Sequence, residues 1–311
     1  MFDYRWRYFD YYMALTTMML MAFGVVAVWS ASGALTPTLL NPGVKQAMFG
    51  AIGVLLMLVF ANTDYRFVGA LAWPAYFFSL LVLVSVKFVG VEIAGARRWF
   101  DLGFTTIQPS EFGKVTTAIA LAWFISSRGE RMKEFGNFVV SLLIVGAPAA
   151  LVFLEPDLGS TMVYCSIWLG MMVVARTRII YILGLFAAMT PIVYFAWSHV
   201  FEDYQRQRLE AFLNPEKHLN GEAYNLIQSR IAVGSSGLFG HGLHGGTQST
   251  EEFLKVKTSD FIFSHVSSMF GFVGMIFLFL LIGFLLFRFI RVIEVSKDSF
   301  GQCLAAALFM I

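Results

Sequence analysis

The stretch "FIFSHVSSMFGFVGMIFLFLLIGFLLFRFI", residues 261–290, is apolar for longer than the roughly 20 residues that a helix needs to cross a bilayer. It therefore predicts a membrane span. Other apolar runs long enough to cross a bilayer precede it, at residues 12–32, 46–61, 67–88, 112–126, 138–153, 160–175 and 179–198. We expect an all-α integral membrane protein, built as a polytopic helical bundle.

The composition agrees with this fold class. Of 311 residues, 58% are hydrophobic and 14% are charged, and the mean hydropathy is +0.71, which is far more apolar than an ordinary globular domain. A net charge of +2 gives no reason to expect a nucleic-acid partner. Cys165 and Cys303 both lie in apolar runs, so the sequence predicts neither a disulfide framework nor a cysteine metal site.

The ends and the loops predict the organisation of the chain. Residues 301–311, "GQCLAAALFMI", begin another apolar run, so we expect residues 1–311 to form a single transmembrane domain that is truncated after about eight and a half spans. If the spans alternate in direction, the basic residues of the short loops share one side, which the positive-inside rule makes cytoplasmic together with the amino terminus. The opposite side then receives the long extracytoplasmic loop 199–260. Its aromatic and aliphatic residues predict amphipathic helices on the membrane surface.

Charged residues gather on the outer side in "GARRWFDLGFTTIQPSEFGK", residues 95–114. Arg97 and Arg98 are adjacent guanidinium groups suited to phosphate oxygens, although a pair that reaches toward lipid headgroups has the same pattern. Glu111 and Lys114 share one helix face just below the surface, either as part of a site or as a buried ion pair.

The turn "EPDLGS", residues 155–160, joins two spans. Glu155 ends one helix and Asp157 begins the next, where a carboxylate accepts hydrogen bonds from free backbone N–H groups. We favour this structural role, with orientation of a sugar or a cation as the alternative.

The segment "GSSGLFGHGLHGG", residues 234–246, is rich in glycine. Such a segment exposes backbone N–H groups to anions, or lets the chain fold back at the membrane edge. His241 and His244 have no third ligand at a recognisable spacing, so a zinc site is not favoured.

Asp260 stands where the polar loop meets the last long apolar run. If the helix begins near Asp260, helical spacing places Ser264, Ser267, Ser268 and Gly271 on its face, and this polar stripe cannot face lipid. A helix–helix contact is one explanation for the stripe. A lone carboxylate on an inward face favours a functional site more strongly.

These segments together resemble the SEDS family of bacterial cell-wall proteins (RodA, FtsW and SpoVE). The matching pieces are "GARRWFDLG" (95–103), "QPSEFGK" (108–114), "EPDLGS" (155–160), "FLNP" (212–215), "YNLIQSRIAVGSSGLFGHGLHGGTQ" (224–248), "SDFIFS" (259–264) and "GFVG" (271–274). The chain departs from the family in the residues before Asp260, and in Ser268 and Met269, where the family usually carries an acidic pair.

The resemblance implies a fold of ten transmembrane helices and a peptidoglycan glycosyltransferase that polymerises lipid II into β-1,4-linked glycan strands, with the general look of the elongation type. It implies a class B penicillin-binding protein as partner and the bacterial cytoplasmic membrane as location. It makes Asp260 the general base, and it leaves a divalent cation open as a cofactor, with no metal ligand assigned. The substrate-binding residues that we expect are Arg97, Arg98, Glu111, Lys114, Glu155, Asp157, Gln228, Ser229, Gly245, Thr247 and Gln248.

Three alternatives remain at this point. A flippase for lipid-linked precursors also needs charged residues in a membrane cavity, but it should carry them along a path across the bilayer. Here the ionisable residues concentrate at the outer ends of the spans, which favours the enzyme. A family member of the division or sporulation type, and a scaffold for a cell-wall complex, are the other two.

Overall fold

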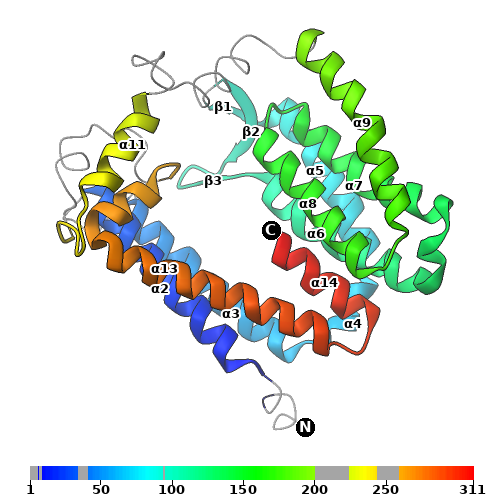
Figure 1. The fold of residues 1–311 in the computed structure, drawn as a ribbon, viewed down its shortest axis with the longest axis horizontal. Helices are drawn as coiled ribbons and strands as arrows, with labels where there is room; N and C mark the ends of the chain where they lie inside the picture. The colour runs from blue at the N-terminus through cyan, green and yellow to red at the C-terminus, as the bar shows by residue number, and fades with distance from the viewer. Residues whose placement is uncertain (1–5, 7–8, 34–40, 94, 200–223, 244–258) are drawn as a thin grey trace. The chain divides into compact units, whose positions relative to one another are not determined.

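The computed structural model describes residues 6, 9–33, 41–93, 95–199, 224–243 and 259–311. Within them, five helices are long and apolar enough to cross a membrane: α2 (Tyr11–Ser32), α3 (Pro42–Asn62), α5 (Ala72–Val89), α7 (Phe135–Phe153) and α13 (Ile262–Val295). The other helices are α4 (Tyr65–Ala70), α6 (Pro109–Arg128), α8 (Leu158–Val174), α9 (Ile179–His199), α11 (Tyr224–Ser235) and α14 (Ser299–Met310), with a 3₁₀ turn η1 at Gly129–Lys133. Figure 1 shows this succession of helices. The predicted polytopic helical membrane fold is confirmed. The predicted apolar runs lie in helix, apart from a break at Leu71 between α4 and α5, a bend at Gly271 within α13, and the end residues Ala175 and Phe261.

The chain divides into two compact units. Unit 1 comprises residues 1–59 and 188–285, and unit 2 comprises residues 60–187 and 286–311. The helix α11 of unit 1 lies inside the segment 199–260 that we expected to be an extracytoplasmic loop.

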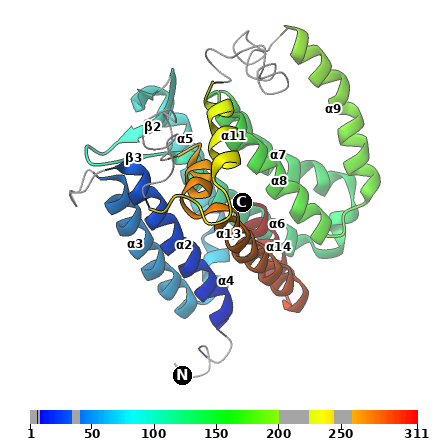
Figure 2. The ribbon, with the colours of Figure 1, turned by 60° about the vertical axis from the view of Figure 1, so that its left-hand side comes forward.

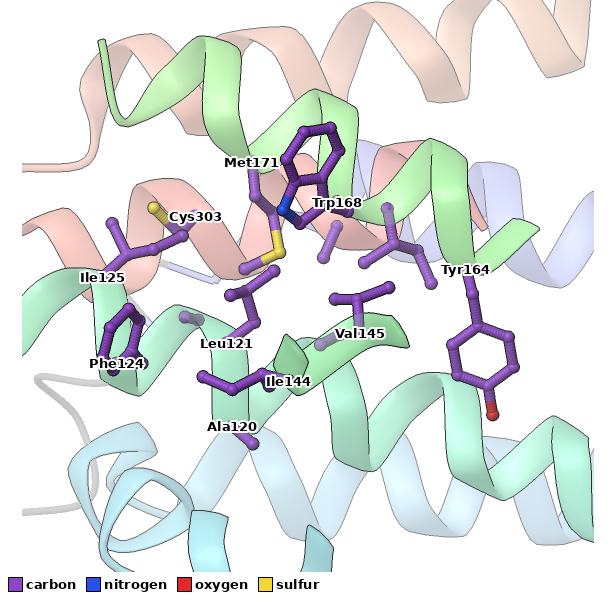
Figure 3. Close-up of a cluster of buried hydrophobic side chains, with 14 of the residues drawn as sticks. Ala120, Leu121, Phe124, Ile125, Ile144, Val145, Tyr164, Trp168, Met171 and Cys303 are labelled. Carbon is purple, nitrogen blue, oxygen red and sulfur yellow. The ribbon is translucent and has the colours of Figure 1, made fainter. Parts of the chain in front are cut away.

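The core of unit 2 is a helical bundle in which α6 packs against α5, α7, α8 and α14. Figure 3 shows its centre, where Leu121 of α6 meets Val145 of α7 and Met171 of α8. Two large polar side chains that enter this core are paired: the Tyr76 hydroxyl donates to the Ile144 carbonyl at 2.8 Å, and the Trp168 indole N–H donates to the Ser141 hydroxyl at 3.1 Å. Pairing is required here because an unpaired polar group in an apolar core is destabilising.

A small antiparallel sheet in unit 2 was not predicted from the sequence. It consists of β1 (Val91–Ile93), β2 (Ala96–Asp101) and β3 (Thr106–Ile107), in the order β1-β2-β3. Glycines make its turns possible, since Gly95 has φ 79° and Gly103 has φ 83°. The sheet brings the Arg97–Arg98 pair to the start of α6.

In unit 1, α2 and α3 lie side by side, as Figure 2 shows. Glycines allow this close approach: a Cβ atom on Gly43 would lie 2.8 Å from the Trp29 Cα, and one on Gly50 would lie 2.7 Å from the Met21 sulfur. Small residues are a common means of close helix packing in membranes.

The uninterrupted span that we predicted for residues 261–290 is wrong at Gly271. This residue has φ 63° and ψ −162°, so α13 consists of two helices joined by a sharp bend. Phe263 and Phe279 lie 16 residues apart, a distance of about 24 Å along a straight helix, yet their ring centroids are 5.9 Å apart. The first part, residues 262–270, therefore folds back on the second.

The glycine-rich segment holds this bend together, an arrangement we call the α13 elbow. The carbonyls of Ser268 and Met269, freed at the end of the first part, accept hydrogen bonds from the N–H groups of His241 (2.9 Å) and Gly242 (3.0 Å). The N–H groups of Phe272 and Val273, which begin the second part, donate to the carbonyls of residues 237 and 238 at 3.0 and 3.1 Å. A broken helix at membrane depth is tolerated only when its backbone groups are satisfied in this way.

Candidate functional site

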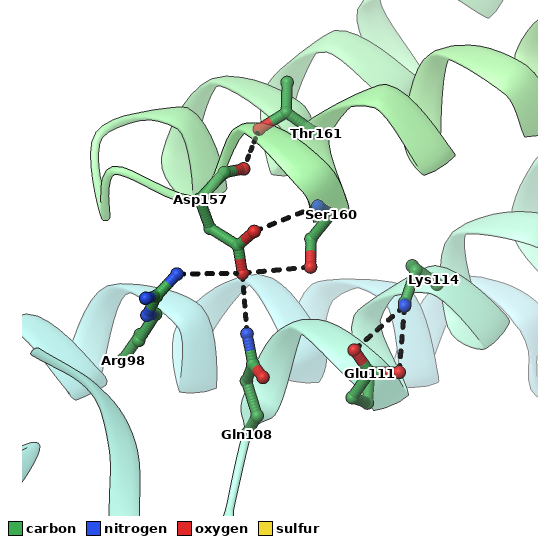
Figure 4. A network of polar contacts seen from close by, with 7 residues as sticks. All are labelled: Arg98, Gln108, Glu111, Lys114, Asp157, Ser160 and Thr161. Atoms are coloured by element: carbon green, nitrogen blue, oxygen red, sulfur yellow. Dashed lines mark hydrogen bonds and ion pairs between the residues drawn. The ribbon is translucent and has the colours of Figure 1, made fainter. Parts of the chain in front are cut away.

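The side chain of Asp157 is the centre of a polar network in unit 2 (Figure 4). It caps α8, because Oδ1 accepts from the Ser160 N–H at 3.0 Å. Oδ2 accepts from the Ser160 hydroxyl at 3.0 Å and from the Gln108 side-chain amide at 2.7 Å, and lies 3.5 Å from Nη1 of Arg98. The capping role favoured from the sequence is therefore present, and the same carboxylate also ties α8 to β2 and to the residue before α6.

Lys114 carries its positive charge into the protein interior on α6. Its side chain is only 9% exposed, and Nζ pairs with both oxygens of Glu111, at 2.9 and 2.8 Å, whereas the Glu111 side chain is 55% exposed. The start of α6 is held in place by Tyr164 of α8, whose hydroxyl donates to the Ser110 carbonyl at 3.2 Å. A Cβ atom on Gly113 would lie 2.3 Å from that hydroxyl, so only glycine permits this approach.

The two arginines do not form one surface. Successive side chains of a strand point to opposite faces, and Arg97 and Arg98 lie next to each other on β2. Arg97 is exposed and pairs with Glu92 at 3.3 Å across the β1–β2 hairpin, whereas Arg98 turns toward Asp157. The adjacent pair in the sequence suggested one donor surface built by both guanidinium groups. The strand instead directs them to opposite faces.

Glu155 is buried in the turn between α7 and α8. It is 3% exposed, and neither carboxyl oxygen has a hydrogen-bond partner among the residues that the structure describes. Burial raises the pKa of Glu155 to about 7, with a smaller upward contribution from Asp157 and opposing contributions from Lys87 and Arg98. This group therefore carries a proton at pH values where an ordinary glutamate has lost it.

In unit 1, the structure corrects the position of Asp260. The helix α13 begins at Ile262, so Asp260 lies in the preceding turn and is exposed, rather than on the inward face of the helix. The polar stripe itself is buried as expected: Ser264 and Ser267 are each 2% exposed, and Ser268 is 1% exposed. The stripe contacts α11, where the Ser264 hydroxyl bonds to that of Ser229. The Ser267 hydroxyl lies 3.3 Å from that of Ser236, the residue that follows α11.

The described residues contain no group of three or more histidine, cysteine, aspartate or glutamate side chains placed to hold a metal ion. Oδ2 of Asp157 already faces Arg98, Gln108 and Ser160, which are all donors toward it. The described part of the site thus offers hydrogen-bond donors and buried charge rather than a ready set of metal ligands.

Comparison with known proteins identifies the family. The model of the FtsW/RodA/SpoVE family, described as cell cycle proteins, matches residues 11–311. The chain belongs to this family. One relative in this family is the peptidoglycan glycosyltransferase MrdB of Escherichia coli K12, which is 34% identical to this chain over 304 residues. The match covers 96% of this chain and 80% of MrdB. Stage V sporulation protein E of Bacillus subtilis is 32% identical over 307 residues, which cover 96% of this chain and 83% of that protein.

Solved structures agree with the family. A chain of a peptidoglycan synthase complex, described as coordinating polymerization and crosslinking, has a TM-score of 0.78 at 25% identity, and the match covers 97% of this chain and 83% of that one. The rod shape determining protein RodA of Thermus thermophilus has a TM-score of 0.68 at 25% identity, with 98% of this chain and 81% of that chain covered.

The remaining predicted site residues of this FtsW/RodA/SpoVE protein are placed as follows. Gln228 and Ser229 lie half-buried on α11, and Oε1 of Gln228 is buried without a hydrogen-bond partner. Gly245, Thr247 and Gln248 lie outside the described residues. Sequence reasoning missed the contact between Nε2 of His265 and the Ser30 hydroxyl, at 3.0 Å, because it joins residues 235 positions apart and no local pattern indicates it.

Proposed function

We propose that this protein polymerises lipid II into β-1,4-linked glycan strands at the outer face of the bacterial cytoplasmic membrane during cell elongation. The observation that carries the proposal is the family match over residues 11–311, with relatives named as peptidoglycan glycosyltransferases. The rod shape determining protein among the structural neighbours supports the elongation role. In this proposal the amino terminus is cytoplasmic, as the positive-inside rule predicts.

The reaction joins a hydroxyl of one lipid-linked sugar to the anomeric carbon of another, and polyprenyl pyrophosphate departs. Asp260 serves as the general base for the acceptor hydroxyl, a role worth about 10²–10⁴-fold in rate. Its exposure leaves the carboxylate accessible to a substrate that arrives from outside. Displacement of an α-linked pyrophosphate with inversion gives the β-linked product.

Positive charge in unit 2 stabilises the leaving pyrophosphate. Lys114 and Arg98 are held in place by carboxylates, Lys114 by Glu111 and Arg98 by Asp157, so their geometry is set before substrate arrives. Preorganised donors of this kind stabilise the charge that develops in a transition state. Arg97, which is exposed and bound only by a surface ion pair, contributes to the first electrostatic attraction of the substrate.

The other predicted residues bind the sugars and the lipid. Glu155 and Asp157 act at the pyrophosphate end, while Gln228, Ser229, Gly245, Thr247 and Gln248 contact the disaccharide. A pocket of about 340 Å³ in unit 1 takes part of the polyprenyl chain, because it is lined mainly by apolar side chains of α11 and of both parts of α13. Its hydroxyls, those of Ser236 and Ser267, lie within hydrogen-bonding distance of each other.

A class B penicillin-binding protein is the proposed partner. The structural neighbour with a TM-score of 0.78 comes from a complex that coordinates polymerization with crosslinking, which supports an assembly of this kind.

The test is polymerisation of labelled lipid II by the purified protein with its partner. Asp260→Asn removes the base and should abolish glycan chains, whereas Ser259→Ala, a control in the same exposed turn, should polymerise normally. Normal polymer from Asp260→Asn would show that the assigned base is wrong. Transfer of lipid II across vesicle membranes without any polymer from the wild type would favour the flippase instead.

A further inference from the structure

Two carboxyl groups of unit 2 lie two residues apart but in opposite environments. The side chain of Asp157 is 12% exposed and faces four donor groups, from Arg98, Gln108 and Ser160. Glu155 is buried, and both of its oxygens lack a partner. Opposite environments are a general means of giving two neighbouring acids different tasks.

The charges around Glu155 come from three elements. Asp157 at the start of α8 favours the protonated form of Glu155, while Lys87 in the last turn of α5 and Arg98 of β2 oppose it. Burial exceeds all of them, so the pKa of Glu155 lies at about 7. A protonated carboxyl is a hydrogen-bond donor, and in the folded protein this donor has no acceptor.

A second donor in the same network is unfilled. Nε of Arg98 is buried without a partner, although Nη1 of the same guanidinium pairs with Asp157. Buried donors without acceptors are rare in folded proteins, and a functional role is one explanation for those that persist. Glu155 and Arg98, which influence each other electrostatically, thus each carry a buried donor without an acceptor, and an oxygen-rich ligand would suit both donors.

We propose that Glu155 works as a neutral carboxylic acid that donates a hydrogen bond to an oxygen of the departing pyrophosphate, alongside Nε of Arg98. This inference rests on the proposed glycosyltransferase function. A neutral acid suits the task because an ionised glutamate would repel the pyrophosphate, whereas the O–H group stabilises the charge that grows on it. No proton needs to be transferred, so a side-chain amide can replace the acid.

The first test compares Glu155→Gln with Glu155→Ala in the polymerisation assay, using the complex with the partner. Glutamine keeps an N–H donor, so Glu155→Gln should retain activity within about tenfold of wild type, whereas Glu155→Ala should lose about 10²–10³-fold in kcat. Wild-type activity should fall as the pH rises through about 7, and Glu155→Gln should not show this decline. The control Glu294→Gln, an exposed carboxyl at the end of α13, should keep both the activity and the decline. The proposal is overturned if Glu155→Gln is as inactive as Glu155→Ala, or if it keeps the alkaline decline.

The second test does not depend on turnover. Infrared difference spectra of wild type against Glu155→Gln should contain a protonated carboxyl band that disappears as the pH rises through about 7, and undecaprenyl pyrophosphate should shift this band. Absence of the band, or a band unaffected by undecaprenyl pyrophosphate, contradicts the inference. If the band behaves as expected but the wild type makes no polymer, the glycosyltransferase proposal fails while the pyrophosphate contact stands.

Discussion

Replacement of Gly271 by alanine should destabilise the α13 elbow and separate it from the glycine-rich segment. The backbone at φ 63° and ψ −162° is a conformation that only glycine adopts readily, and another residue there costs about 1–3 kcal/mol. The new Cβ atom would also lie 2.3 Å from the Gly240 nitrogen and 2.6 Å from the Leu238 carbonyl oxygen. Both of those atoms belong to backbone, so the glycine-rich segment must move away.

That movement would break the four backbone hydrogen bonds between the segment and the elbow. Each contributes about 0.5–1.5 kcal/mol, and more where water is absent to replace it. Strain and lost hydrogen bonds together give a destabilisation of at least about 3 kcal/mol. We expect this loss in denaturant unfolding followed by tryptophan fluorescence in detergent micelles.

Gly283→Ala is the matched control. Gly283 lies in the second part of the same helix, and its Cβ position has no atom within 4 Å. Alanine there should stabilise the helix by up to about 1 kcal/mol, because glycine is the poorer helix former.

A second variant tests whether the elbow acts as one unit. A Cβ atom on Gly240 would lie 2.3 Å from the Met269 carbonyl oxygen, so Gly240→Ala breaks the same contact from the other side. The double variant should then lose much less stability than the sum of the two single losses. If the two single losses of stability add up in the double variant, or if Gly271→Ala is as stable as wild type, the proposal that the glycine-rich segment and the α13 elbow form one unit is refuted.

Three further predictions concern unit 2, all measured as unfolding stability in the same micelles. Asp157→Ala should cost about 2–3 kcal/mol, since it removes the cap of α8 and the contacts to β2 and α6, while Asp157→Asn should cost less because its side-chain oxygen still caps the helix. Glu155→Gln should match wild type at pH 4 and exceed it by about 3 kcal/mol at pH 9. A folded pKa raised from 4.5 to about 7 makes wild-type stability decline between about pH 4.5 and pH 7, where the unfolded chain has lost a proton that the folded protein keeps. A difference independent of pH would contradict the burial argument. Glu111→Gln should destabilise the protein more than Lys114→Met does. The first change leaves the buried Lys114 ammonium without its partner, whereas the second leaves only the exposed Glu111 carboxylate unpaired. Equal losses of stability would show that the burial of Lys114 is unimportant.

Helix positions were predictable because hydrophobic length is read directly from the chain. The ion pair between Glu111 and Lys114 followed from i,i+3 spacing, and the Asp157 cap followed from its place before α8. Both are local interactions, set within a few residues of sequence. The β1–β3 sheet was missed because its strands are short and the three together span only residues 91–107.

The elbow was missed for a different reason. Gly271 lies within a run that is apolar on both sides, and hydropathy has no signal for a backbone that turns back on itself. The cause of the bend lies about 30 residues earlier, in the glycine-rich segment. From the sequence alone, that segment could either bind an anion or let the chain fold back at the membrane edge. Only the folded chain shows that the backbone of this glycine-rich segment supplies the hydrogen bonds that a broken helix requires.

The elbow also changes the argument about Asp260. Helical spacing placed this carboxylate on an inward face, where a charge inside the membrane would itself be the sign of function. Instead, Asp260 is exposed in the turn before a short helix whose serines pack against α11 and whose end is bound by the glycine-rich segment. A base in that position is oriented by the turn that carries it, so its contribution depends on how firmly the turn is held. If that is correct, Gly271→Ala should reduce polymerisation under conditions in which the protein remains folded, and Gly283→Ala should not.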